Sequence, residues 1–321
     1  MNYGIVFVGR NEASRLLHTI PSYLKLKCPL IYVDSGSVDN SIQIIQKNNI
    51  DYIEINEPYS AAKARNKGFE YLTKKYSDIQ YIMFVDSDCS VEEEWCLSAV
   101  STLENEDELG IVCGSTVESY PEKSKYNLLC HLEWQKITGE ISATGGIFMI
   151  KKHVFNKVNG FNENLSCGEE ADLCAKVLQL DKKIKKMEGV MCYHDAQIYT
   201  FSKWAKRCVR GGYAVGLGIK YYPEIAKKES IRSCIKILLW NFIYFLMLVF
   251  LFFQNFVLFG LLFLMIMVSI TKTVKFRQNT FQNSFDDSFI YALFTKIDKP
   301  FMGFGFIKSI LDNKSKLIEY K

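Results

Sequence analysis

Residues 81–91 form the stretch YIMFVDSDCSV, which decides the fold class of this 321-residue chain. The apolar run over residues 80–85 predicts a short buried strand. Two carboxylates, Asp86 and Asp88, follow it directly, although acids disfavour strands and are costly to bury. In parallel α/β sheets, ligands bind beyond the carboxyl ends of the strands. The pair therefore predicts a ligand site at the end of this strand.

The neighbouring segments repeat the same arrangement. Strands are expected at residues 3–9, 30–33 and 52–55, and they alternate with helices over residues 10–24, 41–49 and 60–76. This alternation predicts βαβ units in an α/β fold with a doubly wound, mainly parallel sheet. Further strands are expected at 110–118, 143–150 and 189–194, with helices from residue 166 and over 201–216. Polar residues follow three of these strands and are expected at one sheet edge: Asn11, Glu12, Asp34, Asp86 and Asp88.

Composition narrows the class of protein. The net charge is +4 with both signs interspersed, and this gives no reason to expect a nucleic-acid partner. The ten cysteines form no CxxC pair and lie in apolar segments. The N-terminal residues show no basic region followed by a cleavage site, so we expect reduced cysteines in a cytosolic setting.

Residues 237–271 contain no charged side chain and are long enough to enter a membrane. Gln254 and Asn255 divide them into two runs, each about 25 Å long as a helix. We expect a hairpin with both ends on the cytoplasmic side, because positive charge tends to stay there. A single tilted helix and a buried pair of core helices are the alternatives. Basic residues flank both ends: Arg232, Lys236, Lys272, Lys275 and Arg277.

These features divide the chain into four expected parts. A catalytic domain covers residues 1–222, a linker 223–236, the membrane hairpin or transmembrane segments 237–271, and a cytoplasmic amphipathic tail 272–321. The tail mixes aromatic and basic residues, as segments on a membrane surface do. The predicted location is the cytoplasmic face of the inner (plasma) membrane, with residues 237–271 as the anchor.

The Asp86-Ser87-Asp88 motif is suited to a hard cation. Mg²⁺ and Mn²⁺ prefer carboxylate oxygens and keep phosphate oxygens as further ligands. A solvated turn that caps the next helix is the structural alternative. In the turn after residues 30–33, Asp34 can accept a hydrogen bond from a base or a ribose hydroxyl, whereas Asp39 suits a helix N-cap.

Three further groups have both a functional and a structural interpretation. Arg65 is a fixed fork suited to a phosphate or a base edge, or it lies on a solvated helix face. Gly145 and Gly146 allow a close approach of the backbone to a ligand, or they form a bulge. His194 follows a strand and is either a metal ligand or a structural histidine. The stretch with Trp204, Lys206, Arg207 and Arg210 suits a diphosphate or anionic lipid.

The segment SCGEEADL, residues 166–173, carries candidate general bases. A carboxylate can take the proton of an attacking hydroxyl. Ser166 and Glu169 also fit a capping box, and acids stabilise a helix N-terminus. We therefore expect Glu169 to cap the helix and Glu170 to react.

Seven motifs, in this order, resemble glycosyltransferase family 2 with the GT-A fold over roughly residues 3–216. They are RNEA, VDSGSVDNS, ARNKG, FVDSDCSV, ATGGIFMIKKHVFNKVNGFNE, GEEADL and YHD. The resemblance implies a nucleotide-sugar donor, Mn²⁺ or Mg²⁺ as the cofactor, and inversion at the anomeric carbon.

The resemblance also implies roles for single residues. Asn11, Glu12 and Asp34 would contact the donor, Asp34 at its nucleoside, and Arg65 would line the donor pocket. Asp88 would hold the metal, Asp86 would contact the metal or the ribose, and His194 matches a late histidine on the metal side. Gly145 and Gly146 would line the sugar site. Glu170 matches the catalytic acid of the family, with Glu169 as the second candidate.

The predicted function is transfer of a sugar to a hydroxyl of a glycan or a lipid-linked saccharide, in bacterial surface polysaccharide synthesis. A nucleotidyltransferase is one alternative, but it would need a glycine-rich phosphate loop, and GRNEASR near the N-terminus is acidic and poor in glycine. A non-catalytic membrane scaffold with the same fold is the other alternative.

Overall fold

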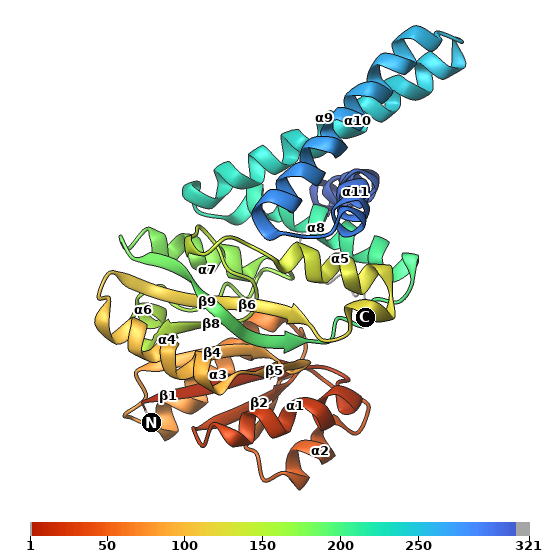
Figure 1. Ribbon diagram of the computed structural model, residues 1–321. Coiled ribbons are helices and arrows are strands. Elements are labelled where there is room, and N and C mark those ends of the chain that lie inside the picture. Colours follow the sequence, from red (N-terminus) through yellow and green to blue (C-terminus); the bar gives the residue numbers. More distant parts are fainter. Residues whose placement is uncertain (1, 313–321) are drawn as a thin grey trace.

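A computed structural model describes residues 2–312, and a mixed nine-stranded sheet forms its centre (Figure 1). The strands are β1 (Tyr3–Gly9), β2 (Leu30–Asp34), β3 (Tyr52–Glu54), β4 (Tyr81–Asp86), β5 (Cys89–Val91), β6 (Leu109–Glu118), β7 (Gly139–Glu140), β8 (Phe148–Lys151) and β9 (Lys183–His194). Their order is β3-β2-β1-β4-β8-β6-β9-β5, and β7 pairs with β9.

Helices cover the sheet and extend beyond it. They are α1 (Ala13–Lys25), α2 (Ser41–Lys47), α3 (Ala61–Lys75), α4 (Glu93–Asn105), α5 (Lys125–Trp134), α6 (Lys152–Lys157), α7 (Glu169–Leu178), α8 (Phe201–Tyr221), α9 (Glu224–Phe252), α10 (Phe256–Phe281) and α11 (Phe285–Leu311). A short 3₁₀ helix, Pro121–Lys123, precedes α5.

The parallel part of the sheet brings the polar strand ends together as expected. β1 pairs in parallel with β2 and β4, and β2 pairs in parallel with β3. Gly9 lies opposite Asp34, and Val8 lies opposite Asp86. The α/β fold is confirmed, and the sheet is mixed rather than mainly parallel because β8 runs antiparallel to both β4 and β6.

Some elements differ from the sequence-based expectation. The strand expected over residues 143–150 begins only at Phe148, and the helix expected from residue 166 begins at Glu169. The short strands β5 and β7 and the helices α4 and α5 were not among the predicted elements. β5 has three residues and follows the acidic turn directly, so no periodicity distinguishes it from a loop. All ten cysteines are free thiols, and nine are buried.

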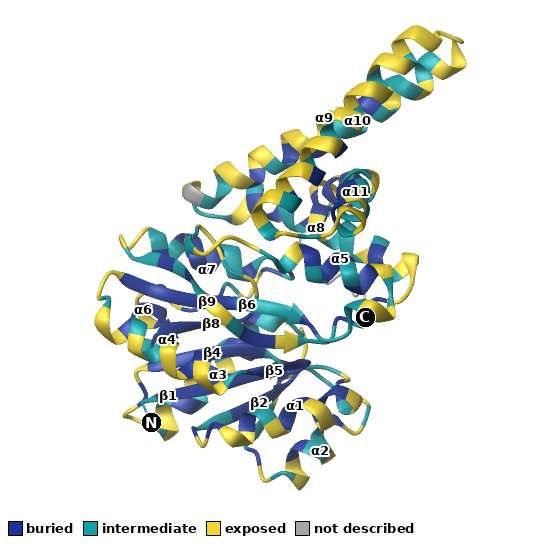
Figure 2. Ribbon diagram, viewed as in Figure 1, coloured by how far each residue is buried: buried dark blue, intermediate teal, exposed yellow. Residues whose placement is uncertain are grey.

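The apolar C-terminal segment forms an antiparallel hairpin that projects away from the sheet (Figure 1). Residues 226–252 and 256–281 are helices long and apolar enough to cross a membrane, and only 11% of each apolar window is buried. Large apolar side chains are exposed near the tip, among them Phe252 and Phe253 (Figure 2). The two runs meet near Gln254 and Asn255, which agrees with the expected hairpin and not with one tilted helix or a buried pair.

The segments on either side of the hairpin are helical. Residues 224–236, assigned above to a linker, form the first turns of α9. The expected tail, residues 272–321, forms the end of α10 and then α11. Helix α11 packs against α8, α9 and α10. Residues 313–321 of the tail lie outside the described part of the chain. Arg277, expected as a flanking surface charge, is instead 2% exposed and donates a hydrogen bond to Gln135.

Candidate active site

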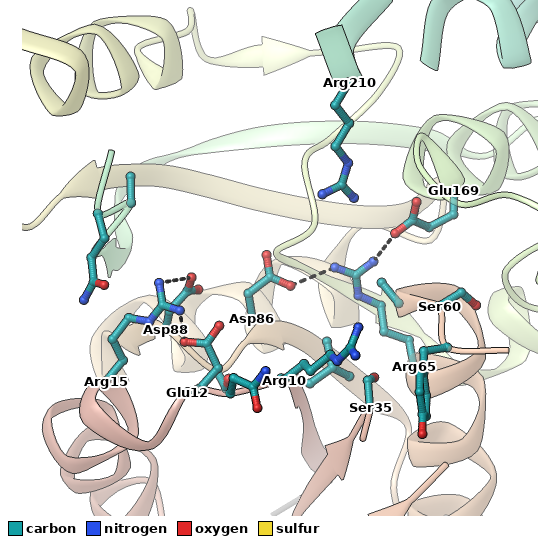
Figure 3. Close-up of a pocket in the computed structure, with 18 of the residues that line it drawn as sticks. Arg10, Glu12, Arg15, Ser35, Ser60, Arg65, Asp86, Asp88, Glu169 and Arg210 are labelled. Carbon is teal, nitrogen blue, oxygen red and sulfur yellow. Dashed lines mark hydrogen bonds and ion pairs between the residues drawn. The ribbon is translucent and has the colours of Figure 1, made fainter. Parts of the chain in front are cut away.

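A cavity of about 580 Å³ lies at the carboxyl ends of β1, β2 and β4 (Figure 3). Seven of the predicted site residues line it: Asn11, Glu12, Arg65, Asp86, Asp88, Glu169 and Glu170. Gly146 lies against this charged group, while Asp34, Gly145 and His194 are not among the lining residues. Residues from distant parts of the chain therefore meet at the sheet edge predicted from the strand ends.

Arg65 is the centre of a buried ionic cluster. Its Nη2 lies 2.9 Å from Asp86 Oδ1, and its Nη1 lies 2.9 Å from Glu169 Oε1 and 3.1 Å from Glu170 Oε1. The side chain is only 2% exposed, and the three carboxylates raise its pKa above the ordinary value despite burial. Arg65 thus lines the cavity, and its terminal nitrogens pair with three acids there; Figure 3 shows its contacts with Asp86 and Glu169. The alternative of a solvated helix face is wrong, because the side chain is buried.

Glu169 is the most deeply buried acid of this cluster. Burial, together with the nearby Glu170 carboxylate, raises the pKa of Glu169 to about 7, and the attraction of Arg65 opposes this shift. Three carboxylates share one guanidinium, so a proton on Glu169 relieves their repulsion. Glu169 therefore exchanges a proton near neutral pH.

The free energy of unfolding is expected to fall as pH rises from about 4.5 to about 7. Stability falls because the folded state binds the proton of Glu169 more tightly than the unfolded chain does. This stabilisation is lost when the folded state releases the proton. Glu169→Gln is expected to flatten this part of the profile. Urea unfolding of both proteins at several pH values measures the difference, and parallel profiles would contradict the assignment.

The start of α7 does not use the predicted capping box. Gly168 is the N-cap with a left-handed backbone, and no side chain caps the helix. Glu169 instead turns to Arg65. Glu170, the next residue, has a side chain 19% exposed and lies at the cavity wall. Of the two glutamates, Glu170 is therefore the more exposed to the cavity.

Gly168 is held by Tyr222, the C-cap residue that follows α8. The Tyr222 hydroxyl donates to the Gly168 carbonyl oxygen at 2.7 Å. A Cβ added at Gly168 would lie 2.0 Å from that hydroxyl, and the backbone φ of +79° is strained for any side chain. Glycine is therefore required where the helix of the two glutamates begins.

Gly168→Ala is expected to lower the free energy of unfolding by about 1–3 kcal/mol, because it combines left-handed strain with a lost hydrogen bond. Turnover should fall with it, since Glu169 and Glu170 follow directly. Gly260→Ala is the matched control, because Gly260 lies in α10 and a Cβ there meets nothing within 4 Å. Thermal unfolding and activity of both variants test this, and equal behaviour would refute the role given to Gly168.

Gly146 is the member of the glycine pair that touches the site. A Cβ at Gly146 would lie 2.6 Å from Arg65 Nη2 and 3.2 Å from both Asp86 Oδ2 and Glu170 Oε1. Of the two glycines, Gly146 is thus the one whose backbone closely approaches a functional group, and that group is the ionic cluster of Arg65.

Asp88 and His194 form a second group beside the first. His194 Nε2 lies 3.1 Å from Asp88 Oδ2, because β5 and β9 pair Cys89 with His194. Asp88, Cys89 and His194 each place one potential ligand atom within 4.8 Å of the other two. Burial raises the pKa of the Cys89 thiol, so the oxygen and nitrogen donors of Asp88 and His194 are the ones suited to a hard divalent cation.

Two residues of this second group were not predicted from the sequence. Arg15 forms an ion pair with Glu12, and its Nη1 lies 3.4 Å from Asp88 Oδ2 (Figure 3). The sequence does contain a sign of this role: Arg15 is a charged residue on the side of α1 that also carries the buried residues Leu16, Thr19 and Ile20. The Trp134 ring stacks on His194 at 4.7 Å, and α5, which carries it, was not among the predicted elements.

Asp34 organises a turn. Its carboxylate accepts from the Ser37 N–H at 2.7 Å and from the Tyr32 hydroxyl at 3.1 Å, and its side chain is fully buried. The same turn holds Asn11, whose N–H donates to Ser37 Oγ. Asp39 accepts from the N–H groups of Ala13 and Ser41, which begin α1 and α2. These acids fix the loops that border the cavity.

The basic stretch of α8 faces two directions. Arg210 and Lys203 line the cavity, and Figure 3 shows Arg210 reaching from α8 toward Asp86 and Glu169. Arg207 points elsewhere and pairs with Glu133 at 2.5 Å, while Trp204 is buried. The cavity thus has both acids and arginines on its sheet side, and α8 adds Lys203 and Arg210.

The chain is similar to several known proteins. Residues 5–161 match the family described as glycosyl transferase family 2. Glycosyltransferase AglE of Haloferax volcanii is 23% identical over 239 residues, covering 71% of this chain and 74% of AglE. The mannosyltransferase PcManGT of Pyrobaculum calidifontis, solved with GDP-Man and Mn²⁺, has a TM-score of 0.59 at 12% identity and covers 98% of this chain and 88% of its own. S. aureus TarS has a TM-score of 0.48 at 15% identity over 72% of this chain, which spans 41% of TarS.

Proposed function

We propose that this chain, whose residues 5–161 match glycosyl transferase family 2, transfers a sugar, with inversion, from a nucleoside diphosphate sugar to a hydroxyl of a membrane-presented acceptor. One observation carries the proposal. The cavity brings together Asp88, the ionic cluster of Arg65 and the partly exposed carboxylate of Glu170, and His194 Nε2 lies 3.1 Å from Asp88 Oδ2. Neither alternative, a nucleotidyltransferase or a non-catalytic scaffold, is favoured by any contact in this site.

Asp88 and His194 would hold the divalent cation, Mn²⁺ or Mg²⁺. The fit rests on the carboxylate oxygen of Asp88, which lines the cavity, and an imidazole nitrogen of His194 that lies 3.1 Å from it. PcManGT, which shares the fold, was solved with Mn²⁺ and GDP-Man. When bound, the cation neutralises the negative charge that develops on a departing diphosphate. Arg210 and Lys203 add positive charge from α8.

Donor contacts are assigned to the residues of the sheet edge. Asn11 and Glu12 line the cavity where the nucleoside would lie, and Asp34 acts through the turn that it holds. Asp86, with a side chain 37% exposed, is proposed as a ribose or metal contact that Arg65 keeps in position. Gly146 leaves the space in which Arg65, Asp86 and Glu170 meet.

Glu170 is proposed as the general base. In a single displacement, the acceptor oxygen bonds to the anomeric carbon while the bond to the diphosphate breaks on the opposite face. Glu170 takes the proton of the attacking hydroxyl. Glu169, which is more deeply buried and bonded to Arg65, positions the start of α7 and is the second candidate.

The hairpin of α9 and α10 is proposed as the membrane anchor. We place the catalytic domain at the cytoplasmic face of the plasma membrane, where a glycan or lipid-linked saccharide presents its hydroxyl. The two candidate spans and their exposed apolar side chains support anchoring. A role in bacterial surface polysaccharide synthesis remains our prediction from the sequence.

Hydrolysis of a panel of nucleotide sugars with Mn²⁺ tests the proposed function. The full chain is expected to hydrolyse at least one donor slowly, and to lose this activity with a chelator. Asp88→Asn is expected to weaken Mn²⁺-dependent nucleotide binding by about 10²-fold or more, since second-shell changes alone cost 10–100-fold. Asp107→Asn is the control because that side chain is fully exposed. Full activity in chelator, or equal binding by both variants, would count against the proposal.

A further inference from the structure

A second cavity, of about 350 Å³, lies behind Glu170. Its walls come from α7, α8, the first turns of α9 and residues 142–144. Glu170 lines both this cavity and the first one. The proposed base therefore stands between a space open to the sheet edge and a space bordered by the helix that continues into the hairpin.

We propose that this second cavity, named here the acceptor groove, binds a neutral sugar of the acceptor and presents its hydroxyl to Glu170. The inference rests on the proposed function, because it assigns the acceptor side of the same reaction. The acceptor oxygen forms the new bond to the anomeric carbon, its proton goes to Glu170, and the electron pair of the broken bond leaves with the diphosphate.

The lining of the groove determines the class of ligand. Among its fifteen described residues there is no lysine, arginine or histidine, and Glu170 and Glu229 are acids. Phosphates in proteins are bound by Arg and Lys, and the two arginines that contact the acids of the groove, Arg65 and Arg232, are already paired with Glu170 and Glu229. The polar lining consists of hydroxyl groups and carboxylates, which match sugar hydroxyls. These residues are Ser142, Thr144, Ser230, Ser233, Glu170 and Glu229.

The remaining wall is apolar and made of small side chains. Ala171 and Ala175 of α7 face Ala214 of α8 and Ala226 of α9 across the groove. Small residues leave room for a ring, and their methyl groups can cover the C–H face of a sugar while its hydroxyls reach the polar side. The serine hydroxyls of the lining can bond the hydroxyls of a neutral sugar, which a bare hydrocarbon chain lacks.

The groove is also held rigid at its junction with the catalytic helix. Tyr222 lines it and bonds to the carbonyl of Gly168, one residue before Glu169. Pro223, the next residue, is the N-cap of α9. The beginning of the candidate membrane span is thus fixed to the beginning of the helix with the proposed base. An acceptor attached to the membrane would meet this corner directly.

Filling the groove provides the test. Ala226→Trp and Ser233→Trp place a large ring in it from α9, and Lys228→Trp, on an exposed position of the same helix, is the matched control. The full chain is assayed with the donor found by the hydrolysis screen. The acceptor probes are octyl glycosides of neutral hexoses, with octyl phosphate and octanol as competitors for the phosphate and hydrocarbon alternatives.

The wild-type enzyme is expected to transfer to at least one octyl glycoside. Both groove variants should lower kcat/KM for that acceptor by about 20-fold or more, as steric exclusion from a shaped pocket does, while Mn²⁺-dependent nucleotide affinity and the Lys228→Trp enzyme change little. Unchanged acceptor kinetics in both groove variants would overturn the proposal. So would competition by octyl phosphate or octanol at the concentrations of the glycosides, or donor hydrolysis without transfer to any neutral glycoside. Absence of donor hydrolysis in the wild type would instead contradict the proposed function itself.

Discussion

Replacing Glu170 by glutamine is expected to lower turnover by about 10²–10⁴-fold, the contribution of a positioned general base. The amide has nearly the same shape, and Arg65 still holds Asp86 and Glu169. The donor site therefore persists, and nucleotide affinity should change by less than about threefold. Initial rates with saturating donor and a separate nucleotide titration measure the two quantities.

Glu169→Gln is the matched comparison for this prediction, because it changes the neighbouring acid in the same way. Glu169 is buried against Arg65, so its replacement should act on stability and its pH dependence more than on the chemical step. A large loss of turnover in Glu169→Gln with little loss in Glu170→Gln would exchange the two roles.

Arg65→Met is expected to destabilise the catalytic domain by about 3–5 kcal/mol at pH 8, which is the cost of leaving a buried charge without its partner. Asp86, Glu169 and Glu170 converge on this guanidinium. Without it, the buried Glu169 must bind a proton or become hydrated. The loss should therefore shrink as pH falls and the acids become neutral.

Urea unfolding of the full chain in detergent, at pH 8 and pH 5.5, measures this effect. Lys67→Met is the control, because Lys67 lies on the same helix and forms only an exposed pair with Glu70, which contributes at most about 1 kcal/mol. Equal stability of the two variants at pH 8 would contradict the central position given to Arg65.

Local sequence patterns were sufficient to predict the polar edge of the sheet and many of the residues that line the site. Alternating strands and helices place the ends of β1, β2 and β4 side by side, so Asn11, Asp34 and Asp86 could be assigned to one edge without coordinates. Asp88 and His194 were proposed as metal ligands separately. Their 3.1 Å approach depends on the pairing of β5 with β9, which is a long-range contact between a three-residue strand and a distant one.

Side-chain partners were less accessible to sequence reasoning. The capping box at Ser166 and Glu169 is locally sound, but Arg65 lies 104 positions away in the chain and draws Glu169 inward. Likewise, nothing in the sequence near Arg65 shows that three acids converge on it. Asp34 illustrates the same point, since its burial beneath Tyr32 and Ser37 is a consequence of packing.

Diffraction from crystals soaked with Mn²⁺ and the preferred nucleotide tests the central claim most directly. The account predicts an anomalous peak that contacts Asp88 and His194 together with the diphosphate oxygens, with Glu170 on the side of the sugar. A diphosphate bound in the cavity with no anomalous peak at Asp88 and His194, or with a peak elsewhere, would contradict it.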